Sequence, residues 1–193
     1  QALSVNSTGN SNNAFGYRAL RCNTTASNNT AVGFCSLFAN TTGASNTAIG
    51  LGSLDANTTG GDNVAVGVAA LGANTTATEN TAVGHRALLL TTTGTRNTGV
   101  GRDALCSNTT GANNVAVGWE AGCSITDSVG HVAVGYEALQ NTTTGDTNVA
   151  MGYRSLFSNT TASNNTAVGT CSLYTNTTGT ENTAVGKDAL KLN

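Results

Sequence analysis

A five-residue motif of the type Asn-Thr-Ala-Val-Gly returns every seventeen residues along this chain, eleven times in all and without insertion or deletion. It reads NNAFG at residues 12–16, NTAVG at 29–33 and NTAVG again at 182–186. A period of this length is too short for a pair of helices and fits one coil of a β-solenoid. Like residues then lie over like about 4.8 Å apart, so eleven coils predict a rod of roughly 50 Å.

We number the columns of the repeat from 0, at the Asn of the motif, to 16. The consensus is N-T-A-V-G-x-x-A-L-x-x-N-T-T-G-x-x. Columns 1–3 predict a short strand, ended in column 4 by an invariant Gly that is free to take a positive φ. The Ala-Leu pair of columns 7 and 8 predicts the start of a second short strand, and Asn-Thr-Thr-Gly predicts a turn. An all-helical array is excluded because so much Asn, Thr and Gly disfavours helix.

The columns also predict what holds the coils together. Val in column 3 and Leu in column 8 form two continuous apolar stripes in the stack, the latter interrupted only by Gly122. Asn in column 0, replaced once by His131, predicts a ladder of side-chain amides or, alternatively, a series of turn caps. The chain has 8 Lys and Arg and 10 Asp and Glu, all confined to columns 5, 6, 9, 13, 15 and 16, which we expect to face water.

The strand is apolar on both of its faces, because column 2 is Ala except at Gly99 and columns 1 and 3 are mostly Thr or Val. Strands that are apolar on both faces are usually buried on both. One interpretation is that one face fills the coil and the uniform Ala allows close approach of a neighbouring copy. The other is that the coil is flat and narrow inside.

The composition bounds the function more than it defines it. Charged residues make up 9% of the chain and the net charge is −2, which gives no electrostatic footprint for nucleic acid. No apolar run approaches the length needed to insert into a membrane. His85 and His131 lie in different columns, and no catalytic triad, carboxylate pair or phosphate-binding loop is evident. We therefore predict a single solenoid domain that is not an enzyme and has neither cofactor nor metal, with a partial coil at 1–11, full repeats over 12–181 and a partial coil at 182–193.

Cysteine and aromatic residues supply the candidate contacts. Cys106 and Cys123 share column 9 on consecutive coils, where a spacing of about 4.8 Å lies within disulfide range; free thiols are the alternative. Aromatic residues gather in column 5, and three roles are open for them: stacking on one another, forming a subunit interface or binding sugar rings. They are Tyr17, Phe34, Trp119, Tyr136 and Tyr153.

Asn-Thr-Thr segments supply candidate glycosylation sites, because many of them form the N-x-[ST] sequon. The alternative is that Asn and Thr simply form a turn there. The candidate acceptors, which would line one edge of the rod, are Asn6, Asn23, Asn40, Asn57, Asn74, Asn108, Asn141, Asn159 and Asn176, and Asn28 and Asn164 begin further sequons in column 16.

The motif N-T-A-V-G-x-x-A-L-x-x-N-T-T-G resembles the head repeat of trimeric autotransporter adhesins, a left-handed parallel β-roll, and the repeats of phage and bacterial tail-fibre-like proteins. The resemblance spans residues 12 to 190 or so. It implies a trimeric, extended element that is extracellular or on a virion surface.

These observations predict a structural and adhesive fibre element outside a cell, on the cell surface or on a virion. Its main partner is itself, in a trimer or in a head-to-tail filament, since both ends of the sequence are partial coils of the same repeat; glycans or a cell surface are further candidates. Two alternatives remain open. One is an ice-binding solenoid that uses the Thr of columns 12 and 13, and the other is a carbohydrate-binding fibre that uses column 5.

Overall fold

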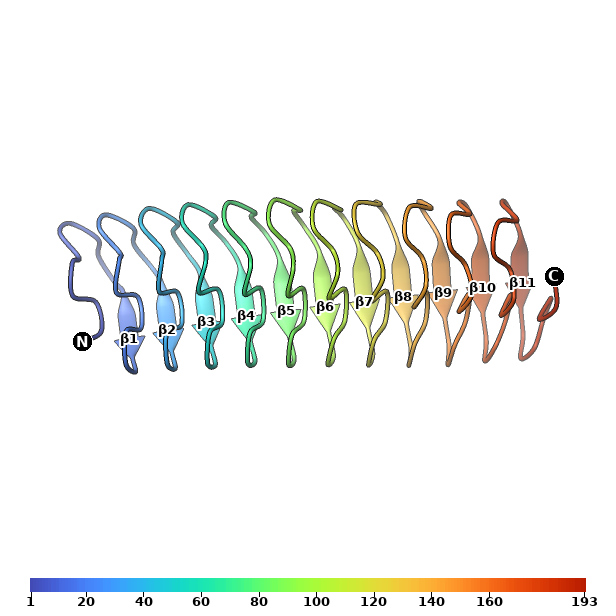
Figure 1. Cartoon of the computed structure of the whole chain (residues 1–193), viewed down its shortest axis with the longest axis horizontal. Helices are drawn as coiled ribbons and strands as arrows, with labels where there is room; N and C mark the ends of the chain where they lie inside the picture. Colours follow the sequence, from blue (N-terminus) through green and yellow to red (C-terminus); the bar gives the residue numbers. More distant parts are fainter.

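Every repeat contributes one three-residue strand to a single parallel sheet of eleven strands, in the order in which they follow in the sequence. The computed structural model describes all residues, 1–193, and shows the coils stacked side by side along one axis (Figure 1). The strands are β1 (Asn13–Phe15), β2 (Thr30–Val32), β3 (Thr47–Ile49), β4 (Val64–Val66), β5 (Thr81–Val83), β6 (Thr98–Val100), β7 (Val115–Val117), β8 (Val132–Val134), β9 (Val149–Met151), β10 (Thr166–Val168) and β11 (Thr183–Val185). The predicted parallel β-solenoid is confirmed.

Strand pairing keeps every column in register. Ala31 of β2 pairs with Ala48 of β3, and the same column pairs at each of the ten junctions. Leu20, Leu37 and Leu54 are all fully buried in one apolar core that runs the length of the rod, as expected of stacked columns. A helix that could span a membrane is not found, since the chain forms strands and turns only.

The residue that points from each strand into the coil is the Ala of column 2. The apolar stripes in the sequence had suggested the bulky residue of column 3 instead. Ala31, Ala48 and Ala65 are fully buried, whereas Val32 and Ile49 keep 36% and 40% of their surface exposed. Successive strand residues point to opposite sides, and the interior between the strand and the Leu of column 8 is narrow enough that a methyl group fills it. The Ala of column 2 therefore lies inside the coil and is not the surface that a neighbouring copy would approach.

Columns 7 and 8 form turns, so the expected second strand is absent. The Leu of column 8 takes a left-handed conformation in every coil that has one, with φ of +49° at Leu20 and +53° at Leu88, and an extended strand cannot contain such residues. The coils are still joined here, because the backbone N–H of Leu20 donates to the carbonyl of Ser36 on the next coil at 2.9 Å.

Column 4 requires glycine for steric as well as conformational reasons. Its φ lies at +139° in Gly67, a region that side chains disfavour. A Cβ placed on Gly67 would also lie 2.3 Å from the carbonyl oxygen of Gly84 on the next coil. The invariance of the column therefore follows from the close stacking of the coils at this corner.

Two different Asn ladders join the coils. In column 0 the side-chain oxygen accepts the backbone N–H of the next coil, as from Asn97 to Asn80 at 2.9 Å, and contacts between the side-chain amides occur at only some steps. In column 11, which the sequence suggested to be a simple turn, the amide of Asn40 donates to the Oδ1 of Asn23 at 3.0 Å and to the carbonyl of Gly43 at 2.9 Å. The continuous amide ladder therefore lies mainly in column 11.

The column 11 ladder is broken where the sequence departs from Asn. Asn74 and Asn108 have the two buried side-chain oxygens that lack a hydrogen-bond partner, and they precede Thr91 and Ile125 respectively. Ile125 is fully buried, and its Cδ1 lies 2.9 Å from the position that a Cβ of Gly122 would take. It therefore fills the space that Leu fills in the other coils.

Candidate functional site

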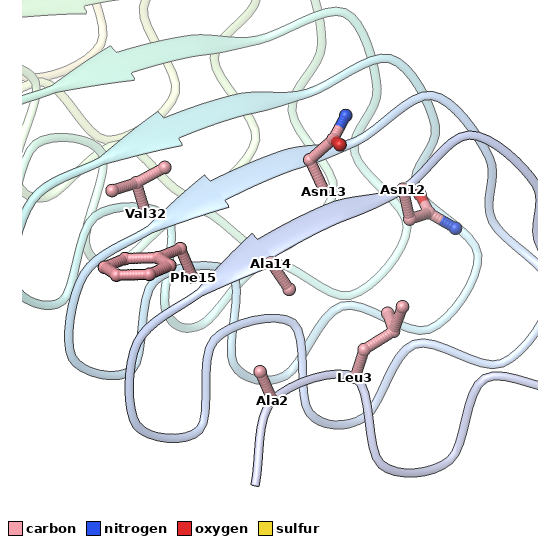
Figure 2. A pocket seen from close by; sticks show the side chains of 7 residues that line it. All are labelled: Ala2, Leu3, Asn12, Asn13, Ala14, Phe15 and Val32. Carbon is pink, nitrogen blue, oxygen red and sulfur yellow. The ribbon is translucent and has the colours of Figure 1, made fainter.

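The rod offers surfaces rather than an enclosed site. No group of three or more His, Cys, Asp or Glu residues is placed to hold a metal ion. The one pocket, with a volume of about 450 Å³, lies at the first coil and is lined by Ala2, Leu3, Asn12, Asn13, Ala14, Phe15 and Val32. Figure 2 shows Ala14 turned toward Leu3 and Asn13 turned to the opposite side of β1. The pocket thus lies around β1 and is lined by residues from both sides of that strand.

The outer face of the sheet, which we define as columns 1 and 3 of β1–β11, is an uncharged surface of mainly Thr and Val that runs the length of the rod. Val64, Val83 and Val117 keep 36–37% of their surface exposed, and Met151 keeps 43%. No residue of either column carries a charge. Ten strand spacings make this face about 48 Å long, and continuous apolar surfaces of this kind mark interaction sites.

Sequence reasoning did not single out the outer face, because it assigned the residues of column 3 to the interior. The signal that identifies this face is side-chain size. Column 2 contains nothing larger than Ala, whereas column 3 includes Phe15, Ile49 and Met151. Side chains that line a close-packed interior usually vary less in volume than this, so the variation in column 3 favours a position on the outside.

The aromatic residues of column 5 form two separate clusters along one flank of the rod. Tyr17 and Phe34 stack with ring centroids 5.3 Å apart. Trp119 meets Tyr136 edge to face at 5.1 Å, and Tyr136 stacks on Tyr153 at 5.3 Å with the ring planes 12° apart. The rings therefore contact one another within each cluster, but Tyr17, Phe34, Trp119 and Tyr153 keep 43–55% of their surface exposed.

Arg154 packs against the second cluster. Its guanidinium carbon lies 5.3 Å from the ring centroid of Tyr153 and 5.2 Å from that of Phe157 in column 9. Its Nε donates to the Glu137 carboxylate at 2.6 Å, which raises the pKa of Arg154, and hydrogen bonding to Glu137 likewise raises the pKa of Tyr136. Arg154 and the contacts between rings thus occupy part of this surface, while Trp119 and Tyr153 keep 43% and 45% of their surface exposed.

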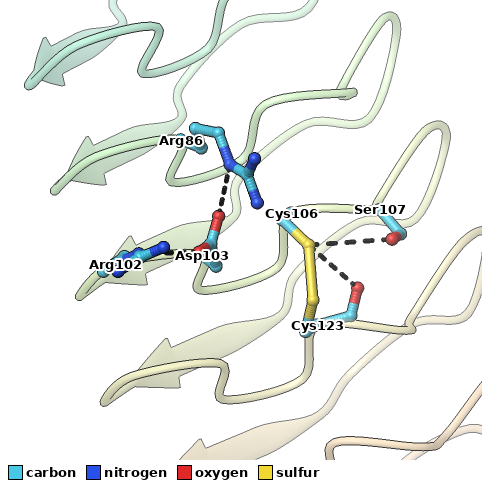
Figure 3. A network of polar contacts seen from close by, with 6 residues as sticks. All are labelled: Arg86, Arg102, Asp103, Cys106, Ser107 and Cys123. Carbon is cyan, nitrogen blue, oxygen red and sulfur yellow. Dashed lines mark hydrogen bonds and ion pairs between the residues drawn. A yellow bond between two sulfur atoms is a disulfide. The ribbon is translucent and has the colours of Figure 1, made fainter.

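Two carboxylates of column 6 are buried, although that column was expected to face water. Asp103 is 3% exposed and Glu137 is 8% exposed. Asp103 accepts from the Nε of Arg86 at 2.6 Å and from the Nε of Arg102 at 3.1 Å, and Figure 3 shows both arginines directed at it. Stacking places opposite charges of neighbouring coils together, and the pairing offsets the cost of burying the carboxylate.

Cys106 and Cys123 are joined by a disulfide between consecutive coils, with their Cα atoms 5.0 Å apart (Figure 3). Cys123 directly follows Gly122, so the bridge staples the coil whose sequence departs most from the repeat. Cys22, Cys35 and Cys171 are free thiols, and each is half-buried.

The candidate glycosylation sites lie mostly inside the rod. The side chains of Asn23, Asn40, Asn57, Asn74, Asn108 and Asn159 are fully buried and Asn176 is 2% exposed, because their amides form the column 11 ladder. Asn6 and Asn141 are half-buried, and each donates its amide to a backbone carbonyl. The folded rod thus encloses the amide nitrogens of the seven buried residues, whereas Asn28 and Asn164 are exposed.

Comparison with protein-family models, with curated proteins and with solved structures gives no match for this chain.

Proposed function

We propose that this protein is a non-enzymatic structural rod, exposed outside a cell or on a virion, whose copies associate laterally through the outer face of the sheet. The observation that carries the proposal is the uncharged outer face of all eleven strands, which consists mostly of Thr and Val, with Val83 and Val117 more than a third exposed. Such a face loses water most effectively against a surface of equal length and equal polarity.

A second copy of this chain meets both conditions. Its outer face has the same length and the same strand spacing, so side chains of one copy can pack between those of another at every coil. Three copies around an axis parallel to the rods would bury the face of each against the other two. The trimer is also what the resemblance of the repeat to adhesin heads implies.

The disulfide between Cys106 and Cys123 supports the proposed location, because such bonds form and persist mainly in oxidising compartments outside the cytosol. The stiffness that a fibre element needs is supported by the continuous backbone pairing and by the two Asn ladders. Both resist bending, because bending would pull apart hydrogen bonds at several columns of the coil at once.

The experiment compares the oligomeric state of two double variants by sedimentation. The variant V83K/V117K places two lysines in the outer face of each copy. It is expected to convert a trimer into a monomer with an unchanged circular dichroism spectrum, because the two lysines from each of three copies cannot be buried together. The matched control T93K/T110K, on the exposed column 13, should remain trimeric. A wild-type chain that is monomeric at high concentration, or a V83K/V117K variant that stays trimeric, contradicts the proposal.

Copies of the protein could also associate end to end, which is a separate mode of assembly. β1 and β11 each have one edge without a neighbouring strand, and such an edge can pair with another chain. Electron microscopy distinguishes the two modes, since lateral association thickens the rod at constant length and end-to-end addition lengthens it. Single short rods at high concentration would exclude the filament.

Ice binding is a second candidate function, on the exposed Thr of column 13 or on the outer face. The column 12 hydroxyls are engaged along the rod, as Thr24 donates to the carbonyl of Thr41 at 3.1 Å. Column 1 presents Thr on six of the eleven strands, separated in places by Val. These residues are Thr30, Thr47, Thr81, Thr98, Thr166 and Thr183. A monomeric wild-type chain with thermal hysteresis that V83K/V117K abolishes would favour ice over self-association.

A further inference from the structure

Column 0 joins consecutive coils through a hydrogen-bond acceptor on each side chain. The Oδ1 of Asn80 accepts the backbone N–H of Asn97 at 2.9 Å, and the Oδ1 of Asn97 accepts that of Asn114 at 3.0 Å. The acceptor is an amide oxygen, which keeps its lone pairs at every pH that a folded protein meets. The junctions made by Asn are therefore insensitive to acid.

His131 takes the place of this Asn between β7 and β9, and it reproduces the same connection with a group that titrates. Its own backbone N–H donates to the Oδ1 of Asn114 at 2.9 Å. The Nδ1 of its ring accepts the backbone N–H of Asn148 at 3.1 Å, and its Nε2 lies 3.2 Å from the Oγ of Ser128. Because Nδ1 accepts, the ring is neutral and carries its hydrogen on Nε2.

We propose that His131 makes an acid-sensitive junction in the rod: protonation at Nδ1 removes the acceptor for the N–H of Asn148 and loosens the coil of β8 from the coil of β9. An imidazolium ring has two donors and no acceptor. Its new N–H would point at the N–H of Asn148, and the buried ring, 1% exposed, cannot turn away to reach water. An unpaired buried donor then weakens this one junction.

The surroundings of the ring favour the neutral form. Burial has the largest effect and lowers the pKa of His131 below 6.5, although the carbonyl of Gly145 and the carboxylate of Asp146 favour the charged ring. Asp146 is itself held by the N–H of Val129 at 2.8 Å. Asp127, in the exposed bend of the preceding coil, is held by the hydroxyl of Thr126.

The direction of the pH dependence follows from this difference between the folded and the unfolded chain. The unfolded chain takes up a proton near pH 6.5 and the folded chain only at lower pH, so the stability contributed by the neutral ring is complete above pH 6.5. It is lost progressively as the pH falls toward the folded pKa. Between pH 7.5 and 5.5 a single such group changes the folding equilibrium constant by at most about tenfold.

The test measures denaturant unfolding of the oxidised protein at pH 7.5 and 5.5 for wild type, H131N and H85N. H131N restores the amide of the other coils, and H85N removes the exposed histidine as a matched control. The folding equilibrium constant of the wild type is expected to fall on acidification by up to about tenfold more than that of H131N, with H85N following the wild type. Equal pH dependence of wild type and H131N overturns the proposal.

Hydrogen exchange at single amides gives a second reading that needs no variant. Acid should lower the protection of the Asn148 amide, which donates to His131, relative to the Asn165 amide, which donates to the Oδ1 of Asn148 at 2.9 Å. Both amides occupy column 0 on neighbouring coils, so intrinsic exchange affects them similarly. Protection that changes in parallel at the two amides contradicts an acid-sensitive junction at His131.

Discussion

The exchange of side chains between columns 8 and 11 at one coil gives a sharp test of how the core is packed. Gly122 stands where the other coils have Leu, and Ile125 stands where the other coils have Asn or Thr. Ile125 fills the space beside Gly122. We therefore expect G122L and I125N to be harmful separately and tolerated together, which is a statement about coupling and not about either residue alone.

The magnitudes follow from the contacts. In G122L the new Cβ would lie 2.9 Å from the Cδ1 of Ile125 and 3.1 Å from the Cδ2 of Leu105, and overpacking of this kind costs about 1–3 kcal/mol. The I125N change leaves a cavity that costs about 2–4 kcal/mol. About 1 kcal/mol of that cost is offset, because the introduced amide can donate to the free Oδ1 of Asn108.

In the double variant G122L/I125N the Leu takes the space that Ile125 vacates, and the Asn continues the ladder. Its stability should lie within about 1 kcal/mol of the wild type, which gives a favourable coupling of at least about 1 kcal/mol. The assay is denaturant unfolding of the four proteins of the cycle, with mass spectrometry to show that the disulfide is intact in each. Additive effects of the two changes would refute the packing described for this coil.

Two further changes test the ladder and the glycine corner. T91N should raise the free energy of unfolding by about 1 kcal/mol, because its amide supplies the donor that the buried Oδ1 of Asn74 lacks, and an unchanged denaturation midpoint would contradict this. G84A should lower the free energy of unfolding by about 3 kcal/mol or more, because its Cβ would lie 2.5 Å from the carbonyl oxygen of Gly101. The control G52A also has a positive φ, but its Cβ would meet no atom closer than 3.8 Å, and it should cost about 1 kcal/mol or less; equal losses for the two would show that stacking is not the cause.

The repeat period by itself determined the architecture of this protein. An uninterrupted interval of seventeen residues allows one coil per repeat, and stacking then places Leu20 over Leu37 and brings Cys106 within reach of Cys123. These consequences need only the period and the strand spacing, because every coil repeats the same path. The column of glycines was predictable for the same reason.

The tertiary structure decided which side of each strand faces inward, and the sequence offered only the variable side-chain size of column 3 as an indication. A three-residue strand is too short to show a period, and columns 1 to 3 are all apolar or nearly so, which leaves the pattern symmetric about its middle residue. The orientation depends on the width of the coil, which is set by the left-handed turn at Leu20 and its equivalents. That turn brings Leu so close to the strand that only Ala fits between them, and Val is left outside.

The roles of the polar residues depended on the fold for a similar reason. Asn23 and Asn28 both begin sequons and look alike in sequence, yet the first is enclosed in a ladder and the second is exposed. His131 is the one residue of column 0 that is not Asn, which the sequence shows. Its role as a hydrogen-bond acceptor is visible only in the structure, where the backbone N–H of Asn148 lies beside its ring. A sequence states which residues share a column; the direction in which a column points is decided by how the coil closes on itself, because that closure fixes which groups can reach water.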